Sequence, residues 1–457
     1  MRRPLFWCAA ACFTLAASLC GQQTDQETIK QLTERLAESE RRIAALEQKL
    51  GMTSAAPALE TTAGSPSAAA TQQANVVPAS DSSAEVDAKI AQAQAEARNQ
   101  DMGGHNMELP GGGPTLNIRG FFDFNFGTGS IANPLDFPVY NNGCMPCGNP
   151  LTLPHTAFQS GEFDLFMTSR LSDHLSFLAE AVFGADTTNA YSIDLERYQL
   201  TYRLNDYFAL TGGRFHTAIG YYNTAYHHGT WFSTAEGRPI MYLFEDSGGN
   251  LPVHTVGMSA TGLVPQTGKF GLHWIAEIGN GRASNPAVFD PVQNFISDRN
   301  HKAFNLAAYI RPEWAQGLQI GGSYYRDRLY PTGFSGDSEY IASAYIVYIT
   351  PTWEFLNEAV MLSDHMVGTP ITFNNPMAYT QLSRKFGIYR PYFRYQYVND
   401  RLGDPASIIT GLYYGPSVGL RMDLSEYAAF KLQYNRLERD LLLPAENGLN
   451  AQIAFTF

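Results

Sequence analysis

The amino-acid sequence predicts an all-β transmembrane protein, a barrel of about sixteen antiparallel strands with an N-terminal coiled-coil helix. Three observations carry this prediction. From Leu116 to the C-terminus, apolar and polar residues alternate with the period of a β-strand. The connections between these segments are short and long in turn. Only 16% of the residues are charged and 13% are aromatic, yet no apolar run long enough for a transmembrane helix follows the N-terminus.

Residues 1–21 have the features of a signal peptide. Arg2 and Arg3 form a positive start, an apolar stretch runs to Leu19, and polar residues follow soon after. Cleavage is expected near Cys20. Acylation of Cys20 is an alternative, although Leu19 is bulkier than the small residue usual before an acylated cysteine. Loss of the two arginines changes the net charge from −12 to about −14, and so acidic a chain argues against a nucleic-acid partner.

Residues 22–50 carry the heptad pattern of a coiled coil. The a positions are Ile29, Leu36, Ile43 and Leu50, and the d positions are Leu32, Ser39 and Leu46. Such a seam buries its apolar face only against a partner helix, so it predicts a homo-oligomer. Mixed Ile and Leu at the a positions leave dimer and trimer open. The alternative is a single amphipathic helix that lies on the barrel.

Residues 51–113 form a linker. Up to about residue 83 the Ala, Ser, Thr, Pro and Gln content cannot build a core. Ser82 and Glu85 then resemble a capping box, which predicts a short helix to about Arg98. Glycines end this region, and the barrel is expected over 114–457.

The barrel region consists of successive half-buried strands. In the first, Leu116 and Ile118 share one face, while Asn117 and Arg119 share the other. Strands of about 10 residues are long enough to cross a bilayer at a tilt. The expected strands start near residues 116, 158, 175, 191, 207, 253, 269, 303, 318, 339, 353, 376, 388, 410, 427 and 448.

The connections alternate in length. Short ones are expected near 172–174, 205–206, 265–268, 312–317, 350–352, 387 and 423–426, and long ones near 127–157, 217–252, 280–302, 328–338, 362–375, 399–409 and 437–447, with a shorter member near 185–190. Outer-membrane barrels have tight periplasmic turns and longer external loops. An even strand number leaves both barrel ends in the periplasm, where the coiled coil must lie. The last strand closes on Phe457, which resembles the signal read by outer-membrane barrel assembly machinery.

The exported coiled coil, the linker and a barrel ending in Phe together resemble the phosphate-selective porin O and P-like group, and the DcaP-like trimeric porins are similar in layout. At residue level the resemblance rests on 161–165, 172–177 and 213–216. It implies an outer-membrane porin that assembles as a trimer. Phosphate specificity does not follow, because only Lys269 and Lys431 are clear lumen-facing lysines.

The third long connection, about 217–252, is the candidate constriction. It is too apolar to lie freely in water, so we expect it to fold into the lumen and narrow it; packing on the barrel mouth or on a neighbouring subunit is the alternative. Its candidate residues are Tyr221, Tyr222, Tyr226, His227, His228, Trp231, Glu236 and Arg238. Adjacent histidines in an extended chain point to opposite sides and no third ligand is spaced for them, so neither a metal nor a cofactor is expected.

Charged residues on the polar faces of the strands are the candidate pore lining. They are Arg119, Asp123, Arg197, Arg203, Arg214, Glu277, Arg390, Arg394, Arg421 and Lys431. An interior with so many charges is expected to be wet, because each unpaired buried charge costs several kcal/mol. The alternative for any one of them is a structural ion pair. The sign of ion selectivity stays open, since arginines inside favour anions and the acidic chain favours cations at the mouth.

We therefore expect a porin in the bacterial outer membrane that passes small polar or charged solutes by passive diffusion, with its coiled coil in the periplasm and outer-membrane lipid around it. Cys144 and Cys147 are expected to form a local disulfide, since a redox site would need a helix in an α/β fold. No motif marks a catalytic nucleophile, so an enzyme is not expected. The alternatives are a structural tether or adhesin with a closed barrel, and a barrel hydrolase.

Overall fold

The computed structural model describes the barrel and parts of its connections. The described residues are 105–107, 115–129, 156–185, 191–226, 231–242, 249–282, 299–330, 335–401, 403–406, 411–439 and 445–457. All of them belong to one compact unit, 79–457. The predicted signal peptide and coiled coil, and the linker as far as residue 104, lie outside the described residues. None of the described helices is both long and apolar enough to span a bilayer.

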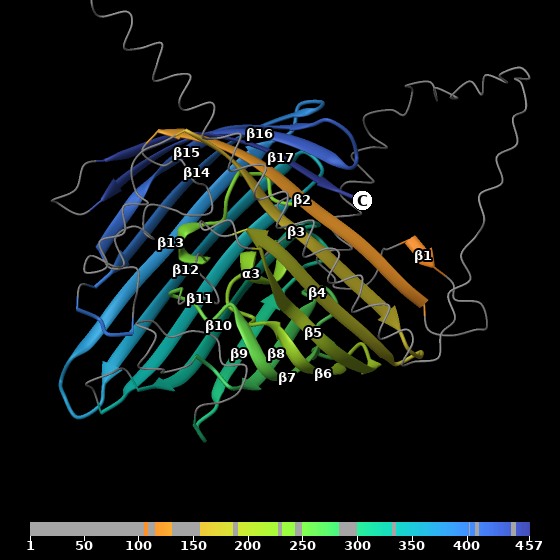
Figure 1. Cartoon of the computed structure of the whole chain (residues 1–457). Coiled ribbons are helices and arrows are strands. Elements are labelled where there is room, and N and C mark those ends of the chain that lie inside the picture. Colours follow the sequence, from red (N-terminus) through yellow and green to blue (C-terminus); the bar gives the residue numbers. More distant parts are fainter. Residues whose placement is uncertain are drawn as a thin grey trace, which may run out of the picture. The chain divides into compact units, whose positions relative to one another are not determined.

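Sixteen antiparallel strands close into a barrel (Figure 1). They are β2 (Thr115–Gly129), β3 (Ala157–Arg170), β4 (Leu175–Ala185), β5 (Tyr191–Asn205), β6 (Phe208–His216), β7 (His254–Leu263), β8 (Leu272–Gly279), β9 (Ala303–Ile310), β10 (Leu318–Leu329), β11 (Asp337–Ile349), β12 (Trp353–Met366), β13 (Thr372–Arg384), β14 (Tyr389–Asp400), β15 (Gly411–Asp423), β16 (Ala428–Arg439) and β17 (Glu446–Thr456). Each strand pairs with the next along the chain, and β17 pairs back with β2. The predicted fold class and strand number are confirmed.

The first and last strands close the ring. Phe455 of β17 lies opposite Phe122 of β2. Phe457 adds two backbone hydrogen bonds with Gly120, each 3.0 Å long. Beyond the end of β17, the short strand β1 (His105–Met107) pairs with the start of β2. The linker prediction missed β1, because so short a strand shows no alternating pattern of its own.

The strands turn apolar side chains outward and polar ones inward. In β14, Arg390 and Arg394 are buried, while Tyr389 and Phe393 on the other face are exposed. The same alternation runs through β10 to β17. Successive side chains of a strand point to opposite faces, so each strand contributes both to an apolar outer belt and to a polar interior.

The short turns lie at one end of the barrel, here called the turn end, and the longer connections lie at the other, the loop end. One predicted long connection, 362–375, was wrong: β12 and β13 are joined over 367–371 only. Polar residues favour a loop there, but they pair across the two strands instead. Ser363 donates to Asn374 over 2.8 Å, and this ladder extends both strands.

Candidate functional site

The connection between β6 and β7 crosses the interior of the barrel. This inner loop, 217–253, contains the one-turn helix α3 (Tyr222–Ala225) and the 3-10 turn η3 (Ile240–Tyr242). Figure 1 shows α3 within the ring of strands. Hydrogen bonds from the inner loop reach inward-facing side chains of β8, β11, β12, β14, β15, β16 and β17. The loop is therefore fixed to the far wall rather than standing at the mouth.

Glu358, an inward and fully buried residue of β12, is the main acceptor for the inner loop. The backbone N–H groups of Tyr221 and Tyr222 donate to its carboxylate over 2.6 and 2.9 Å, and the Tyr242 hydroxyl donates over 2.9 Å. The Tyr379 hydroxyl of β13 adds a fourth bond. Donors on both sides of one carboxylate hold the start of α3 and the end of η3 at a single point, because hydrogen bonds to an ionised group are strong.

The chain can pass so close to Glu358 because residue 220 is glycine. Gly220 has φ +71°, a left-handed conformation that side chains disfavour. A Cβ there would also overlap the Tyr242 hydroxyl and the Glu358 carboxylate. Glycine at this position therefore meets two requirements: it adopts the left-handed backbone conformation, and it fits the narrow space beside the Glu358 carboxylate.

Three cations of the wall hold the middle of the inner loop through its carbonyl groups. Arg394 donates to Gly237 O over 3.0 Å. Arg421 donates to Ser233 O over 2.9 Å, and Lys431 donates to Ala235 O over 3.4 Å and also to the Ser233 hydroxyl. Carbonyl oxygens carry partial negative charge, so these buried cations lose hydration but gain directed acceptors.

Glu236 is the buried carboxyl group of the inner loop. Gln433 and Asn450 donate to its Oε2 over 3.2 and 3.4 Å, and its own N–H donates to the Tyr392 hydroxyl. Burial raises the pKa of Glu236 from 4.5 to about 7, although these amides and nearby cations favour the ionised form. Its Oε1 has no hydrogen-bond partner in the described part of the chain. A protonated Oε1 therefore fits this site.

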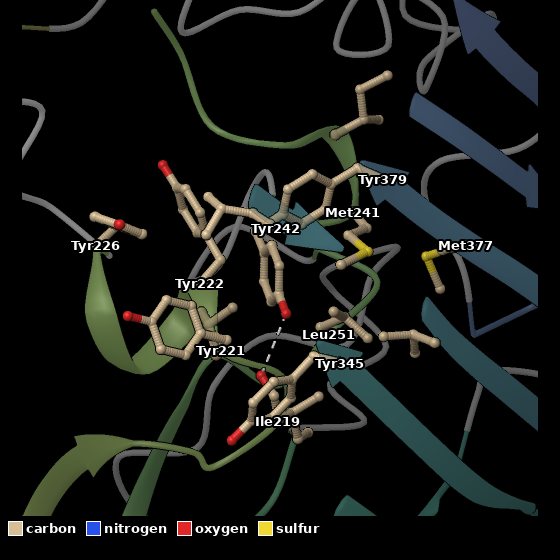
Figure 2. Packing of buried hydrophobic residues seen from close by; sticks show 14 of the residues in the cluster. Ile219, Tyr221, Tyr222, Tyr226, Met241, Tyr242, Leu251, Tyr345, Met377 and Tyr379 are labelled. Carbon is tan, nitrogen blue, oxygen red and sulfur yellow. Dashed lines mark hydrogen bonds between the residues drawn. The ribbon is translucent and has the colours of Figure 1, made fainter. Parts of the chain in front are cut away.

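Aromatic side chains of the inner loop pack against the wall (Figure 2). The rings of Tyr222 and Tyr242 stack at 5.4 Å, and the Tyr221 ring lies 5.8 Å from that of Tyr345 in β11. Tyr379 of β13 meets Tyr222 edge-on. These rings are almost fully buried. The apolar composition of the loop is thus accommodated by a core inside the barrel, along the strands β9 to β17 and β2.

A cavity of about 650 Å³ occupies the other side of the interior, between the inner loop and the strands β3 to β11. Tyr221 and Thr224 of the inner loop form part of its wall. About half of the remaining lining residues carry hydroxyl, amide or charged groups, and the charged members include Arg203, Asp206, Glu277 and Arg311. Asp206 lies in the β5–β6 turn, so the cavity extends from the turn end to the level of the loop.

The candidate constriction residues that are described lie in the inner loop. Tyr221 lines the cavity, and Tyr222, Tyr226, Trp231 and Glu236 are buried on the wall side. Arg238 contacts Glu162 of β3 at 3.4 Å. The pairs His227–His228 and Cys144–Cys147 lie outside the described residues. Within the described ranges, no three His, Cys, Asp or Glu side chains are grouped so that they could hold a metal ion.

The candidate pore-lining residues fall into several groups. Arg203 and Glu277 line the cavity. Arg394, Arg421 and Lys431 hold the inner loop instead. The others bind wall partners: Asp123 contacts Asn125 and Gln452, Arg197 pairs with Glu180, and Arg390 donates to Pro351 O. Arg119 is half-buried on β2.

Arg214 lies at the loop end of β6 and is fully buried. It lies 3.1 Å from His254 and 3.7 Å from Glu196, and both of these residues are also buried. The neighbouring Gly213 has φ +136°, which disturbs the strand pleat at this point. The place of Arg214 in the pore lining stays a prediction.

Glu358 and Gly220 are the functional residues that sequence reasoning missed. Alternation marks Glu358 as inward-facing, yet it cannot show that four donors meet there. Gly220 follows a strand end, where glycine is common and carries no specific signal. Their partners are distant in sequence, since 137 positions separate Tyr221 from Glu358.

Comparison with known proteins identifies only the fold. No family model matches the chain, and no curated protein matches it. The outer-membrane channel DcaP of Acinetobacter baumannii matches with a TM-score of 0.51 and 10% identity, over 77% of this chain and 99% of that one. OmpF of Salmonella typhi, solved in complex with daunomycin, matches with a TM-score of 0.50 and 10% identity, over 77% of this chain and 100% of that one. The chain therefore has the sixteen-stranded barrel fold of outer-membrane porins.

Proposed function

We propose that this chain, whose fold is that of outer-membrane porins, is a channel for passive diffusion of small polar or charged solutes, narrowed by the inner loop 217–253. The observation that carries the proposal is the asymmetric interior. Packed side chains join the inner loop to one side of the wall, while a polar cavity of about 650 Å³ follows the other side. Because the loop fills one side of the barrel, the open path is limited to that cavity.

The cavity has the chemistry of a water-filled path. Hydroxyl groups of Thr201, Thr211 and Thr261, on three successive strands, line it beside Arg203 and Arg311. Such groups bind water and polar solutes, whereas an apolar lining would exclude both. Tyr221 and Thr224 lie where the path passes the inner loop, so they are the proposed determinants of its width.

The charges of the lining favour weak ion selectivity. Arg203 and Arg311 are balanced by Asp206 and Glu277. Pore selectivity follows the lining charge and the width, so a balanced lining discriminates solutes mainly by size. A reversal potential near zero in a salt gradient is therefore expected, and a strongly shifted one would contradict the balance.

Location and assembly follow from the sequence and the outer belt. We infer that the barrel lies in the outer membrane, with the predicted coiled coil of 22–50 in the periplasm and a trimer as its oligomer. The proposed role is transport without catalysis. A structural tether with a closed barrel, the main alternative, would pass neither ions nor solutes.

The test is conductance of the purified protein in a planar bilayer. The intact chain should form ion-conducting pores, and deletion of 221–246 should raise the single-channel conductance, because the wall side of the lumen is then emptied. Shortening the exposed 367–371 turn is the matched control and should leave conductance unchanged. An unaltered conductance after the first deletion would show that the inner loop does not limit the path.

A further inference from the structure

A cluster of cations lies on the outward face of the barrel at the loop end of β10. We propose that this basic patch, made of Arg326 and Arg328, binds the headgroup of a membrane lipid that carries phosphate monoesters, with the acyl chains of that lipid on the apolar strip beside it. The inference rests on the proposed membrane location, and it concerns the lipid rather than the transported solute.

The strand register places the patch outside the lumen. Arg326 lies opposite Phe304 of β9 and Tyr340 of β11, and these three residues share the outward face. The guanidinium carbon of Arg326 is 5.6 Å from the centre of the Tyr340 ring. Arg328 follows two positions later on the same face, 5.5 Å from the centre of the Tyr330 ring. Solutes inside the barrel cannot reach these groups.

Among the described residues, no carboxylate on that face neutralises the two arginines. Among the outward residues of β9, β10, β11 and β12, all of which are described, there is no Asp or Glu. Asp327 and Glu339 point inward and are buried. Within the described part of the chain neither guanidinium forms an ion pair with a carboxylate. The terminal N–H groups of the two guanidiniums are therefore the donors that we assign to an external anion.

Further cations lie next to the patch. Arg299 contacts the same Tyr330 ring as Arg328, also at 5.5 Å, although Asp327 at 3.6 Å offsets its charge. Burial lowers the pKa of His301; the charge of Asp327 opposes this shift, and the charges of Arg299, Arg326 and Arg328 add to it. The positive potential is thus concentrated at one place on the rim.

The residues beside the patch, toward the middle of the strands, are apolar and exposed. The exposed fractions of Phe304, Leu306 and Tyr324 are 49%, 63% and 50%. A cation above an apolar strip suits an amphiphile, because the guanidinium binds phosphate in a bidentate fashion while the strip contacts hydrocarbon. A free phosphate ion would use the arginines but not the strip, and this difference favours a lipid.

The opposite end of the barrel provides a matched control. Arg384 also lies on the outward face, at the turn end of β13, with its guanidinium carbon 4.9 Å from the ring centres of Trp353 and Phe386. It is a single cation between two rings rather than a pair of adjacent cations. Arg384→Ala should therefore leave binding at the patch unaltered.

The experiment titrates the full chain in detergent with bis-phosphorylated lipid A and follows bound lipid by native mass spectrometry. R326A/R328A should weaken binding roughly thirtyfold, which corresponds to about 2 kcal/mol, because each arginine near a membrane surface contributes about 1 kcal/mol to anionic lipid binding. The affinity of R326K/R328K should lie between those of the intact chain and R326A/R328A, because lysine keeps the charge but loses the bidentate geometry. Lipid A without phosphates should bind the intact chain no better than phosphorylated lipid A binds R326A/R328A.

Two results would overturn the proposal. Equal affinity of the intact chain and R326A/R328A for lipid A would show that the patch binds no headgroup. Displacement of the lipid by millimolar inorganic phosphate would show a site for the free anion instead. Conductance separates this inference from the proposed function: R326A/R328A should conduct like the intact chain, whereas absence of conductance from every variant would contradict the channel itself.

Discussion

Glu358 holds the inner loop entirely through acceptor oxygens. Its partners are two backbone N–H groups and two tyrosine hydroxyls, and all of them are buried. Removal of a carboxylate from such a site leaves several donors unpaired, and each buried unpaired group costs about 1–3 kcal/mol. The stability of the loop is therefore concentrated in one side chain.

Glu358→Ala should lower the free energy of unfolding by about 3 kcal/mol or more, because four donors lose their acceptor. Urea unfolding followed by tryptophan fluorescence measures this, since Trp231 of the loop is buried. Glu438→Ala is the control: among the described residues, Glu438 pairs with Arg436 on the surface, and such pairs contribute about 0–1 kcal/mol. Equal losses of unfolding free energy in the two variants would show that Glu358 does not hold the inner loop.

Glu236 predicts a pH dependence of stability. Its pKa is raised from 4.5 to about 7 in the folded chain, so folding favours the protonated form. The corresponding stabilisation is fully present below pH 4.5 and is lost as the pH rises through about 7. A shift of this size corresponds to a loss of up to about 3 kcal/mol.

Glu236→Gln should remove this dependence, because the amide keeps the shape of the protonated carboxyl but does not titrate. Thermal midpoints of both proteins, measured from pH 4.5 to 8, should converge at low pH and separate at high pH, with the variant the more stable. Parallel midpoints over the whole range would contradict the assignment. Other titrating groups are common to the two proteins and cancel in the difference.

At the scale of elements, the sequence was sufficient for the strands and insufficient for the contacts of the inner loop. Each strand has one face in lipid and one in the lumen, so alternation alone located all sixteen. It failed at 362–375, where the outward face is polar, with Ser363, His365 and Asn374, and the inward face carries Leu362 and Met366, so the expected pattern is inverted. The aromatic content of 217–252 indicated a covered loop, but its partners lie on strands more than a hundred positions away.

The closing strand β17 also carries a prediction. The Phe457 ring lies over Gly120, where a Cβ would overlap it, and it stacks with Phe163 at 6.2 Å. Phe457→Ala should reduce the fraction of folded barrel and lower stability by about 1–2 kcal/mol, less than for a fully buried phenylalanine. The shift of folded barrel on unheated gels measures this. Leu424→Ala, at an equally exposed turn residue, should have little effect, and similar losses in both would argue against a special role of the last residue.

At the scale of the whole molecule, the interior has two unlike halves. Buried residues alternate with more exposed ones where the inner loop packs, from β10 to β17, with few interruptions. From β4 to β8 many residues are half-buried, because the cavity exposes their inner faces as well. The same barrel therefore combines a packed core on one side with a polar path on the other.

Assembly is the remaining prediction at this scale. The closure of β2 on β17 involves only barrel residues, so deletion of 22–50 should leave the barrel folded but weaken the oligomer. Mass measurement in detergent should give a trimer for the intact chain and smaller species for the deletion. Deletion of a matched length from 51–83 is the control and should preserve the trimer. A monomeric intact chain would refute the proposed assembly.

The anchors of the inner loop have a consequence for how such a channel can change. Three side chains of the wall form hydrogen bonds with main-chain atoms of the loop: Arg394 with Gly237 O, Arg421 with Ser233 O and Gln396 with Ile240 N–H. Main-chain carbonyl groups are present in every amino acid, so these hydrogen bonds do not depend on the side chains that face the path. Replacement of Thr224 or Ala225 can therefore alter the width of the path while the hydrogen bonds from the wall to the loop backbone stay intact. Single substitutions, in evolution or by design, can therefore change the width of the pore while the hydrogen bonds between the inner loop and the wall are kept.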